Sequence, residues 1–145
     1  IIQQTHKSNT DNLKNIYDEA EIENIIFDFE ENLADLINQS DLCITRAGAS
    51  TLAELSIMNK PFLTIPLVSA KDNHQFENAN FYQNLGCCWI MSQKDFNDVN
   101  LEKFLNHIIM NKSEYNVKKN NLEKHNFQNS WNDINQKILE TINEN

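Results

Sequence analysis

The feature that most constrains the fold of this chain is a regular alternation of short apolar runs with segments of helical spacing, over about the first ninety residues. The apolar runs have the length of β-strands and comprise Ile1 to Gln4, Asn24 to Phe29, Leu42 to Thr45, Pro61 to Val68 and Cys87 to Met91. The intervening segments comprise Asn12 to Ala20, Asn32 to Asn38, Thr51 to Met58 and Asn73 to Leu85. This order predicts a β-α-β-α chain.

Several predicted strands are apolar on both sides, which is typical of a parallel sheet covered by helices on both faces. Right-handed crossovers then give an α/β fold with a Rossmann-like, doubly wound parallel sheet. Gly86 is predicted to be the left-handed cap of the helix that ends at Leu85. Helical patterns alone follow Asp98, at Leu101 to Met110, Tyr115 to Lys124 and Trp131 to Ile142. We expect a domain over residues 1–127 and a C-terminal helix over residues 128–145.

Composition excludes several classes of function. The 145 residues include 21 acidic and 12 basic side chains, a formal charge of −9, so the chain should repel nucleic acids and anionic lipid. No apolar run approaches the roughly 18 residues that span a bilayer. Three cysteines without Cys-x-x-Cys spacing and four scattered histidines favour reduced thiols in the cytoplasm and no metal site. No P-loop, Gly-x-Gly-x-x-Gly fingerprint or nucleophile elbow is found, and no catalytic residue is predicted within this chain.

Two strand-to-helix turns are candidate binding loops, because ligands of open parallel sheets bind beyond the carboxyl ends of the strands. The first turn is Thr45-Arg46-Ala47-Gly48-Ala49-Ser50-Thr51-Leu52-Ala53-Glu54. Gly48 permits a positive φ and close approach of a ligand to the backbone. The free N–H groups of the first helical turn form a site for an anion or a hydroxyl group.

Two side chains of the first turn have alternative interpretations. Thr51 and Glu54 match a capping box, in which the acid only satisfies the start of the helix, and spacing alone favours that interpretation. Alternatively, the Glu54 carboxylate accepts two hydrogen bonds from a vicinal diol such as a ribose. Arg46 either forms an ordinary salt bridge, which is favoured, or neutralises a phosphate.

The second turn, again from strand to helix, is Val68-Ser69-Ala70-Lys71-Asp72-Asn73-His74-Gln75-Phe76-Glu77-Asn78. Asp72 and Gln75 also match a capping box. Alternatively, Gln75 and Asn78 lie three residues apart on one helical face, where their amides can donate to and accept from sugar hydroxyl groups. His74 is expected to be solvated rather than to act as a general base.

The run "SDLCITRAGASTLAELSIMNKPFLTIPLVSAKDNHQFENANFYQNLG", Ser40 to Gly86, resembles the carboxyl-terminal donor domain of the MurG family, bacterial N-acetylglucosaminyltransferases of peptidoglycan synthesis. The resemblance lies in Arg-Ala-Gly-Ala, a Glu six residues after the Gly, a Lys-Pro strand, and Asp-x-His-Gln followed by Asn-Ala. It extends less strictly over residues 1–97. It implies the second Rossmann-like domain of a two-domain, GT-B type glycosyltransferase that holds UDP-N-acetylglucosamine and uses no cofactor.

The resemblance also implies roles for individual residues. Ala49, Ser50 and Thr51 would offer backbone and hydroxyl groups to the sugar and diphosphate, within a binding run that includes Gly48, Leu52 and Ala53. Glu54 would hold the ribose. Gln75, with Asn78 behind it, would read the N-acetylglucosamine hydroxyl groups. Glu30 falls where the family contacts uracil through main-chain atoms, although its side chain departs from the apolar residue common there.

The resemblance implies a larger enzyme. The glycine-rich diphosphate loop would precede Ile1, and an amino-terminal domain would bind the lipid-linked acceptor and supply the base. This segment alone should therefore be inactive, and the enzyme is expected in the cytoplasm at the inner face of the cell membrane as a peripheral protein. The C-terminal helix, with its apolar stripe of Trp131, Ile134, Ile138 and Leu139, would cross back to the missing domain. The alternatives are the soluble subunit of a split dolichol-linked N-acetylglucosamine transferase and a non-catalytic nucleotide-sugar-binding module.

Overall fold

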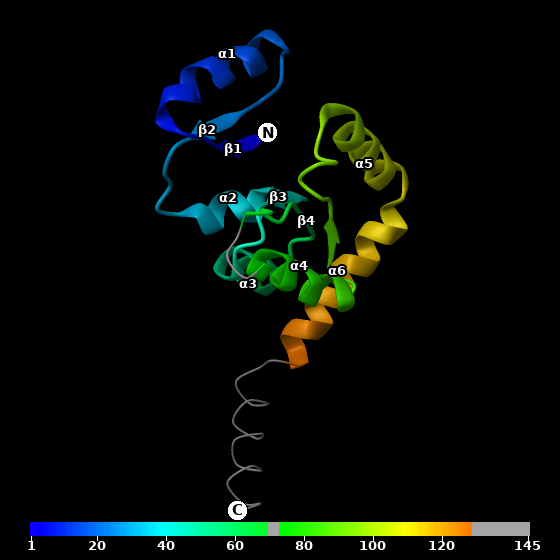
Figure 1. The fold of residues 1–145 in the computed structure, drawn as a ribbon. Coiled ribbons are helices and arrows are strands. Elements are labelled where there is room, and N and C mark those ends of the chain that lie inside the picture. The colour runs from blue at the N-terminus through cyan, green and yellow to red at the C-terminus, as the bar shows by residue number, and fades with distance from the viewer. Residues whose placement is uncertain (70–72, 129–145) are drawn as a thin grey trace, which may run out of the picture. The chain divides into compact units, whose positions relative to one another are not determined.

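The computed structural model describes residues 1–69 and 73–128. The chain divides into two compact units, Ile1–Ser40 and Asp41–Asn145 (Figure 1). Each unit contains its own parallel sheet, with two strands in the first and three in the second. The expected α/β architecture with parallel strands and intervening helices is therefore confirmed.

The first unit is a β-α-β element followed by a short helix. Its elements are β1 (Ile2–Gln4), the 3₁₀ turn η1 (Lys7–Asn9), α1 (Thr10–Glu19), β2 (Ile25–Phe27) and α2 (Leu33–Gln39). The two strands pair in parallel, with Ile2 opposite Ile25. The Tyr17 hydroxyl of α1 donates a hydrogen bond to Oε1 of Gln3, at 2.6 Å, and thereby ties the crossover helix to β1.

The second unit contains the three-stranded sheet. Its elements are β3 (Cys43–Thr45), α3 (Ala49–Ile57), β4 (Phe62–Thr64), α4 (His74–Asn84), β5 (Cys88–Ile90), α5 (Asp98–Met110) and α6 (Lys112–Gln128). The parallel strands lie in the order β3-β4-β5, with Phe62 opposite both Cys43 and Cys88. The predicted strand Pro61 to Val68 is longer than β4, because Pro66 has no N–H group with which to continue the ladder.

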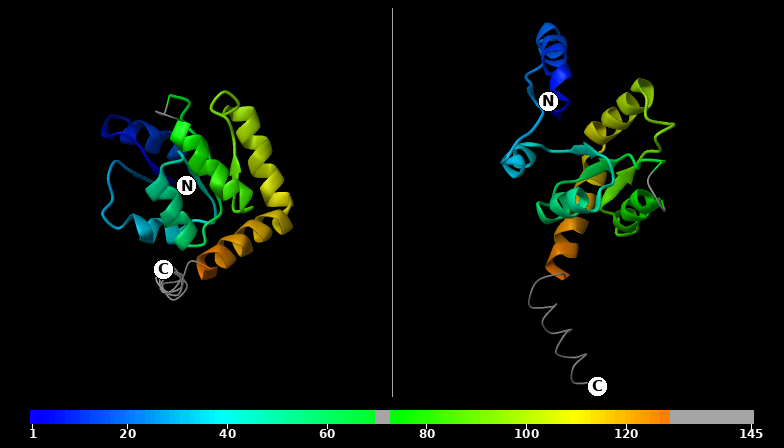
Figure 2. Two further views of the ribbon diagram at one scale, coloured as in Figure 1. Left: turned by 60° about the horizontal axis from the view of Figure 1, so that its bottom comes forward. Right: turned by 60° about the vertical axis from the view of Figure 1, so that its left-hand side comes forward.

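Helices cover both faces of this sheet, as expected for a doubly wound fold. Phe62 makes an edge-to-face contact with Tyr82 of α4, at 5.6 Å between ring centroids. The neighbouring position in the sheet, Leu63, pairs with Trp89, whose ring contacts Phe104 of α5 at 5.5 Å. Because successive side chains of a strand point to opposite faces, α4 and α5 lie on opposite sides of the sheet. Figures 1 and 2 show α3 and α4 on one side and α5 on the other.

The core of the chain lies where α3, α4 and α6 meet this sheet. The largest fully buried side chains there include Leu52, Leu55, Phe62, Leu63 and Leu122. Cys87 and Cys88 are buried in the same region, and all three cysteines are free. Burial raises the pKa of the Cys88 thiol to about 12, so this sulfur is essentially never a thiolate at neutral pH.

The end of α4 confirms the predicted left-handed glycine. Gly86 has φ +69°, and the N–H groups of Gly86 and Cys87 donate to the carbonyl oxygens of Gln83 and Tyr82, at 2.8 and 2.9 Å. These two bonds form a Schellman motif. Nδ2 of Asn121 in α6 donates to the Gly86 carbonyl at 3.2 Å, so α6 satisfies one more carbonyl group at this helix end.

A second asparagine of α6 does the same for α3. The side-chain amide of Asn126 donates to the carbonyl of Ser56, at 2.5 Å, and to Oδ1 of Asn59, at 2.7 Å. Asn59 is left-handed, with φ +53°, and follows the end of α3. Helix α6 thus holds the C-terminal ends of the two helices whose N-terminal ends carry the predicted site residues.

Some sequence predictions fall on residues that the structure does not describe. The predicted apolar stripe of Trp131, Ile134, Ile138 and Leu139 lies outside the described residues, as does Asp72. Among the residues that are described, none of the helices is both long enough and apolar enough to cross a membrane.

Candidate functional site

The first candidate loop shows that the predicted capping box of Thr51 and Glu54 is wrong. Helix α3 begins at Ala49, two residues earlier than predicted, and its N-cap is Gly48. Thr51 is therefore the third helical residue, and Glu54 lies almost a full turn beyond it. Gly48 carries no side chain that could cap the helix, and among the described residues no side chain caps it, which leaves the N–H groups of the first turn for an external acceptor. The Glu54 side chain is exposed to solvent.

Gly48 has open space beside it and an ordinary backbone conformation. Its φ is −70° and its ψ is 133°, values that any residue can adopt. A Cβ at this position would meet only Oγ1 of Thr51, at 3.8 Å, which is an ordinary contact. The protein's own packing therefore does not demand a glycine. The surface above the N-terminus of α3 is left bare, as close approach of a ligand to the backbone requires.

The second loop fixes the Gln75 side chain. Its Oε1 atom accepts a hydrogen bond from the Leu67 N–H, at 2.9 Å. The N-cap of α4 is Asn73, in the left-handed conformation with φ +55°, rather than Asp72. Gln75 therefore ties the start of α4 to the segment that follows β4. Its side-chain NH₂ group is the part of the amide left for a ligand.

Asn78 joins the two candidate loops. Its Nδ2 atom donates to the carbonyl of Ala47, at 3.1 Å, and Ala47 is completely buried. Helices α3 and α4 also pack against each other. The loop after β3 and the start of α4 therefore lie side by side at the carboxyl end of the sheet, where an open parallel sheet binds its ligands.

Arg46 follows β3 and forms hydrogen bonds to residues that follow β4 and β5. Its Nη1 atom donates to the carbonyl of Ile65, just after β4, and to Oε1 of Gln93, beyond β5, with both distances at 3.2 Å. Within residues 1–69 and 73–128, no ion pair of Arg46 is found. The structure therefore does not support the favoured salt bridge among these residues and shows two neutral acceptors.

Gln93 is the residue of this region that the sequence predictions did not include. It lies three residues after β5, so its position in a loop beyond the carboxyl end of a strand is a signal that could have identified it. Its role as an acceptor for Arg46 depends on a contact across 47 residues of sequence.

The other predicted site residues have different surroundings. Ala49, Ser50 and Thr51 form the first turn of α3, with Ala49 and Ser50 exposed. The Leu52 side chain is fully buried, and the Leu52 N–H donates to the Gly48 carbonyl, at 3.0 Å. Ala53 is half-buried.

Glu30 belongs to the first unit, and its Oε1 accepts from the Asn32 N–H, at 2.9 Å. Its predicted uracil contact stays a prediction.

Comparison with known proteins identifies the family to which this chain is similar. The model of the glycosyltransferase family 28 C-terminal domain matches residues 1–138. The chain is 50% identical, over all of its 145 residues, to the UDP-N-acetylglucosamine--N-acetylmuramyl-(pentapeptide) pyrophosphoryl-undecaprenol N-acetylglucosamine transferase of Pelagibacter ubique. It is 38% identical, over 86% of its length, to the enzyme of the same name from Rickettsia bellii.

A solved structure agrees with the fold. The crystal structure of Acinetobacter baumannii MurG superimposes with a TM-score of 0.72 at 26% identity, and the match covers 86% of this chain and 36% of that one. The chain spans 41% of the Pelagibacter relative and 35% of the Rickettsia relative. Because the family model covers nearly the whole chain, the chain belongs to glycosyltransferase family 28, as a C-terminal domain of that family.

Proposed function

We propose that this chain is the donor-binding part of an inverting glycosyltransferase, which transfers N-acetylglucosamine from UDP-N-acetylglucosamine to lipid-linked N-acetylmuramyl-pentapeptide in peptidoglycan synthesis. Family membership and the transferase activity named for the relatives support the reaction. The observation that carries the proposal is the hydrogen bond from Asn78 to Ala47, because it brings the two candidate loops together at the carboxyl end of the sheet.

The open N-terminus of α3 is suited to the diphosphate and sugar of the donor. The N–H groups of Ala49, Ser50 and Thr51 and the partial positive charge of the helix end favour a negatively charged ligand. As UDP leaves, these groups would stabilise the charge that develops on the diphosphate. The bare surface over Gly48 allows the ligand to reach the backbone closely.

Glu54 is proposed to hold the ribose. Its carboxylate is exposed and takes no part in capping α3, so both oxygens can accept hydrogen bonds from the ribose hydroxyl groups. Gln75 and Asn78 are proposed to read the sugar. Since Gln75 uses its oxygen for Leu67 and Asn78 uses its nitrogen for Ala47, the pair presents the Gln75 NH₂ group as donor and the Asn78 oxygen as acceptor.

The chain spans 41% of the Pelagibacter relative, so the whole reaction is proposed for a longer enzyme. We propose that an acceptor hydroxyl group attacks the anomeric carbon while UDP departs, with the base supplied from outside this chain. The acceptor carries a lipid, so the enzyme would work at the inner face of the cell membrane as a peripheral, cytoplasmic protein.

The test is a nuclear magnetic resonance titration of the ¹⁵N-labelled chain with UDP-N-acetylglucosamine, UDP and N-acetylglucosamine. We expect shifts of the amide signals of residues 48–54, 75 and 78, with UDP-N-acetylglucosamine binding more tightly than the free sugar. Glu54→Ala and Gln75→Ala should each weaken binding by about tenfold, the loss of about one charge-assisted or buried hydrogen bond. Glu102→Ala, an exposed change on α5, is the control. Unchanged affinity in both site variants, or no binding by the folded wild type, would overturn the proposal.

A further inference from the structure

One arginine side chain links the carboxyl ends of three neighbouring strands. Arg46 comes directly after β3, Ile65 directly after β4, and Gln93 three residues after β5. Two strand spacings, roughly 10 Å, separate β3 from β5, and the side chains of Arg46 and Gln93 bridge this distance together. The contact is therefore a built feature of this edge rather than a local turn.

The two acceptors of Arg46 hold the guanidinium group without neutralising it. A backbone carbonyl and the side-chain oxygen of Gln93 are both uncharged, and both are bonded to Nη1. Since a guanidinium has five N–H donors, the groups on Nη2 and Nε are not used by these two bonds. The chain has a net charge of −9, and Arg46 nevertheless places an exposed positive charge with neutral hydrogen-bond partners at this edge of the sheet.

The arginine adjoins the donor site proposed above. Its neighbour Ala47 accepts the hydrogen bond of Asn78, and Gly48 follows as the N-cap of α3. The backbone of Arg46 therefore directly precedes the loop whose N–H groups are proposed to meet the diphosphate. A forked, permanently charged group is the side chain best matched to phosphate oxygens.

We infer that Gln93 is a positioning residue that holds Arg46 at the carboxyl edge of the sheet, with its charge directed to the diphosphate of the nucleotide sugar. The inference rests on the proposed function and extends it to residues outside the predicted binding run. Glutamine suits this task because its side chain is neutral. A glutamate at position 93 would hold the arginine at least as strongly, but it would also cancel the positive charge.

A purely structural clamp predicts the opposite response to that substitution. Gln93→Glu replaces a hydrogen bond from the guanidinium to a neutral amide oxygen with an ion pair, which is stronger. If Arg46 only joins the three strand ends, Gln93→Glu should leave nucleotide binding unchanged or improve it. If Arg46 serves the diphosphate, Gln93→Glu should weaken UDP binding although the fold becomes no less stable.

The experiment compares UDP with uridine as ligands of the wild-type chain, Gln93→Glu and Gln93→Ala. We expect Gln93→Glu to weaken UDP binding by about tenfold, and Gln93→Ala by about threefold, with uridine binding unchanged in both. Gln83→Glu adds the same charge at an exposed position near the C-terminal end of α4 and is the matched control. Thermal unfolding measures the stability of every variant, and the Arg46 Nε–H signal should shift with UDP but not with uridine.

The outcomes separate the two proposals. If the wild type binds neither UDP nor UDP-N-acetylglucosamine, the proposed function fails and the role of Gln93 fails with it. If the wild type binds UDP and Gln93→Glu binds it equally well, only the role of Gln93 is overturned. Equal losses for UDP and uridine would also overturn it, because a positioned charge should act only on the phosphates.

Discussion

Asn78 donates its side-chain amide to the carbonyl of Ala47, 3.1 Å away, and so connects helix α4 with the loop that follows β3. Because Ala47 is completely buried, its carbonyl has no ready access to water if this partner is removed. Asn78 thus shapes the candidate site through its nitrogen and leaves its oxygen for a ligand. This division of the amide makes a specific prediction possible.

Asn78→Ala should destabilise the fold by about 1 to 3 kcal/mol, since it leaves a buried carbonyl unpaired. Asn78→Asp should be no better at pH 7, because a carboxylate oxygen then faces the Ala47 carbonyl, but it should recover below about pH 4 as the acid becomes protonated. Urea denaturation at pH 7 and pH 3.5 measures both effects. Gln83→Ala, an exposed change on the same helix, is the control. Equal stability of Asn78→Ala and the wild type would contradict the structure.

The two glycines of the chain should respond oppositely to alanine. At Gly86, with φ +69°, a Cβ would lie 2.6 Å from Nδ2 of Asn121, so Gly86→Ala should cost at least about 1 to 2 kcal/mol. At Gly48 a Cβ meets no close atom, so Gly48→Ala should stay within about 0.5 kcal/mol of the wild type. The same Gly48→Ala change should weaken UDP-N-acetylglucosamine binding, because the methyl group occupies the space above the helix terminus.

The double variant Gly86→Ala with Asn121→Ala separates the two costs at Gly86. Removing the asparagine relieves the collision and leaves only the strain of the positive φ. The double variant should therefore be more stable than the sum of the two single effects predicts. Strict additivity of the free energies of unfolding would show that Asn121 does not crowd this position.

Glu54 distinguishes a capping role from a binding role. Glu54→Ala should change the free energy of unfolding by less than about 0.5 kcal/mol, because α3 begins at Ala49 and the carboxylate is exposed. Asn97→Ala is the positive control, since Oδ1 of Asn97 accepts from the Asn100 N–H at 3.0 Å and caps α5. That change should cost about 1 kcal/mol. A comparable loss in Glu54→Ala would restore the capping interpretation.

The sequence was sufficient for the class and order of the elements and insufficient for side-chain partners. Apolar runs identify the strands, and all three residues of β4 are buried, as a strand covered on both faces requires. Gly86 marks a helix end because glycine adopts its positive φ without steric cost. The start of α3 was misplaced because Thr51 and Glu54 fit a local motif, whereas the chain begins the helix at a residue with no capping side chain. Local spacing cannot reveal which of two competing starts the tertiary packing selects.

The contacts of Arg46 and Asn126 show the same limit at longer range. Their partners lie 19 to 47 residues away for Arg46 and about 70 residues away for Asn126. Many asparagines in the sequence have no evident role from composition alone. Two of them, Asn121 and Asn126, acquire one only when α6 is placed beside the ends of α4 and α3.

Alkaline pH should weaken the fold through Cys88. Burial raises the pKa of this thiol from 9.0 to about 12, so the folded state holds a proton that the unfolded chain releases. Its contribution to stability is fully present below pH 9 and is lost as the pH rises from 9 to 12, at no more than about 1.4 kcal/mol per pH unit. The difference in free energy of unfolding between the wild type and Cys88→Ala should therefore shrink between pH 8 and pH 10.5. Parallel curves for the two proteins would contradict this.

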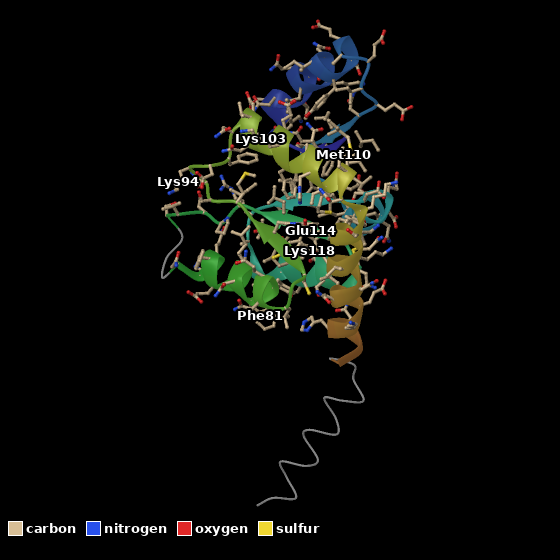
Figure 3. All side chains as sticks on the ribbon, turned by 90° about the vertical axis from the view of Figure 1, so that its right-hand side faces the viewer. Phe81, Lys94, Lys103, Met110, Glu114 and Lys118 are labelled. Atoms are coloured by element: carbon tan, nitrogen blue, oxygen red, sulfur yellow. The ribbon has the colours of Figure 1, made fainter. Side chains whose placement is uncertain are left out.

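Acid should release a contact between β5 and α6 that centres on Glu114. The Trp89 indole N–H donates to one carboxylate oxygen of Glu114, at 2.6 Å, and Nε2 of His107 lies 2.7 Å from the other. Lys118 stands 4.7 Å from the centre of the Trp89 ring, and Figure 3 shows Glu114 and Lys118 together on α6. The hydrogen bond from Trp89, followed by that from His107, lowers the pKa of Glu114 below its ordinary 4.5.

A carboxylate with a lowered pKa adds stability above its ordinary pKa, and that stability is lost as the pH falls through the lowered value. The side chains of His107 and Glu114 are 53% and 40% exposed, so the contribution should stay below about 1 kcal/mol. Glu114→Gln keeps an acceptor for Trp89 and cannot ionise, so its stability deficit at pH 7 should shrink as the pH falls below 4.5 and through the lowered pKa of Glu114. In a Trp131→Phe background Trp89 is the only tryptophan, and its fluorescence should change over the same acid range when Glu114 is present but not in Glu114→Gln. An identical fluorescence titration in Glu114→Gln would mean that another group senses the acid.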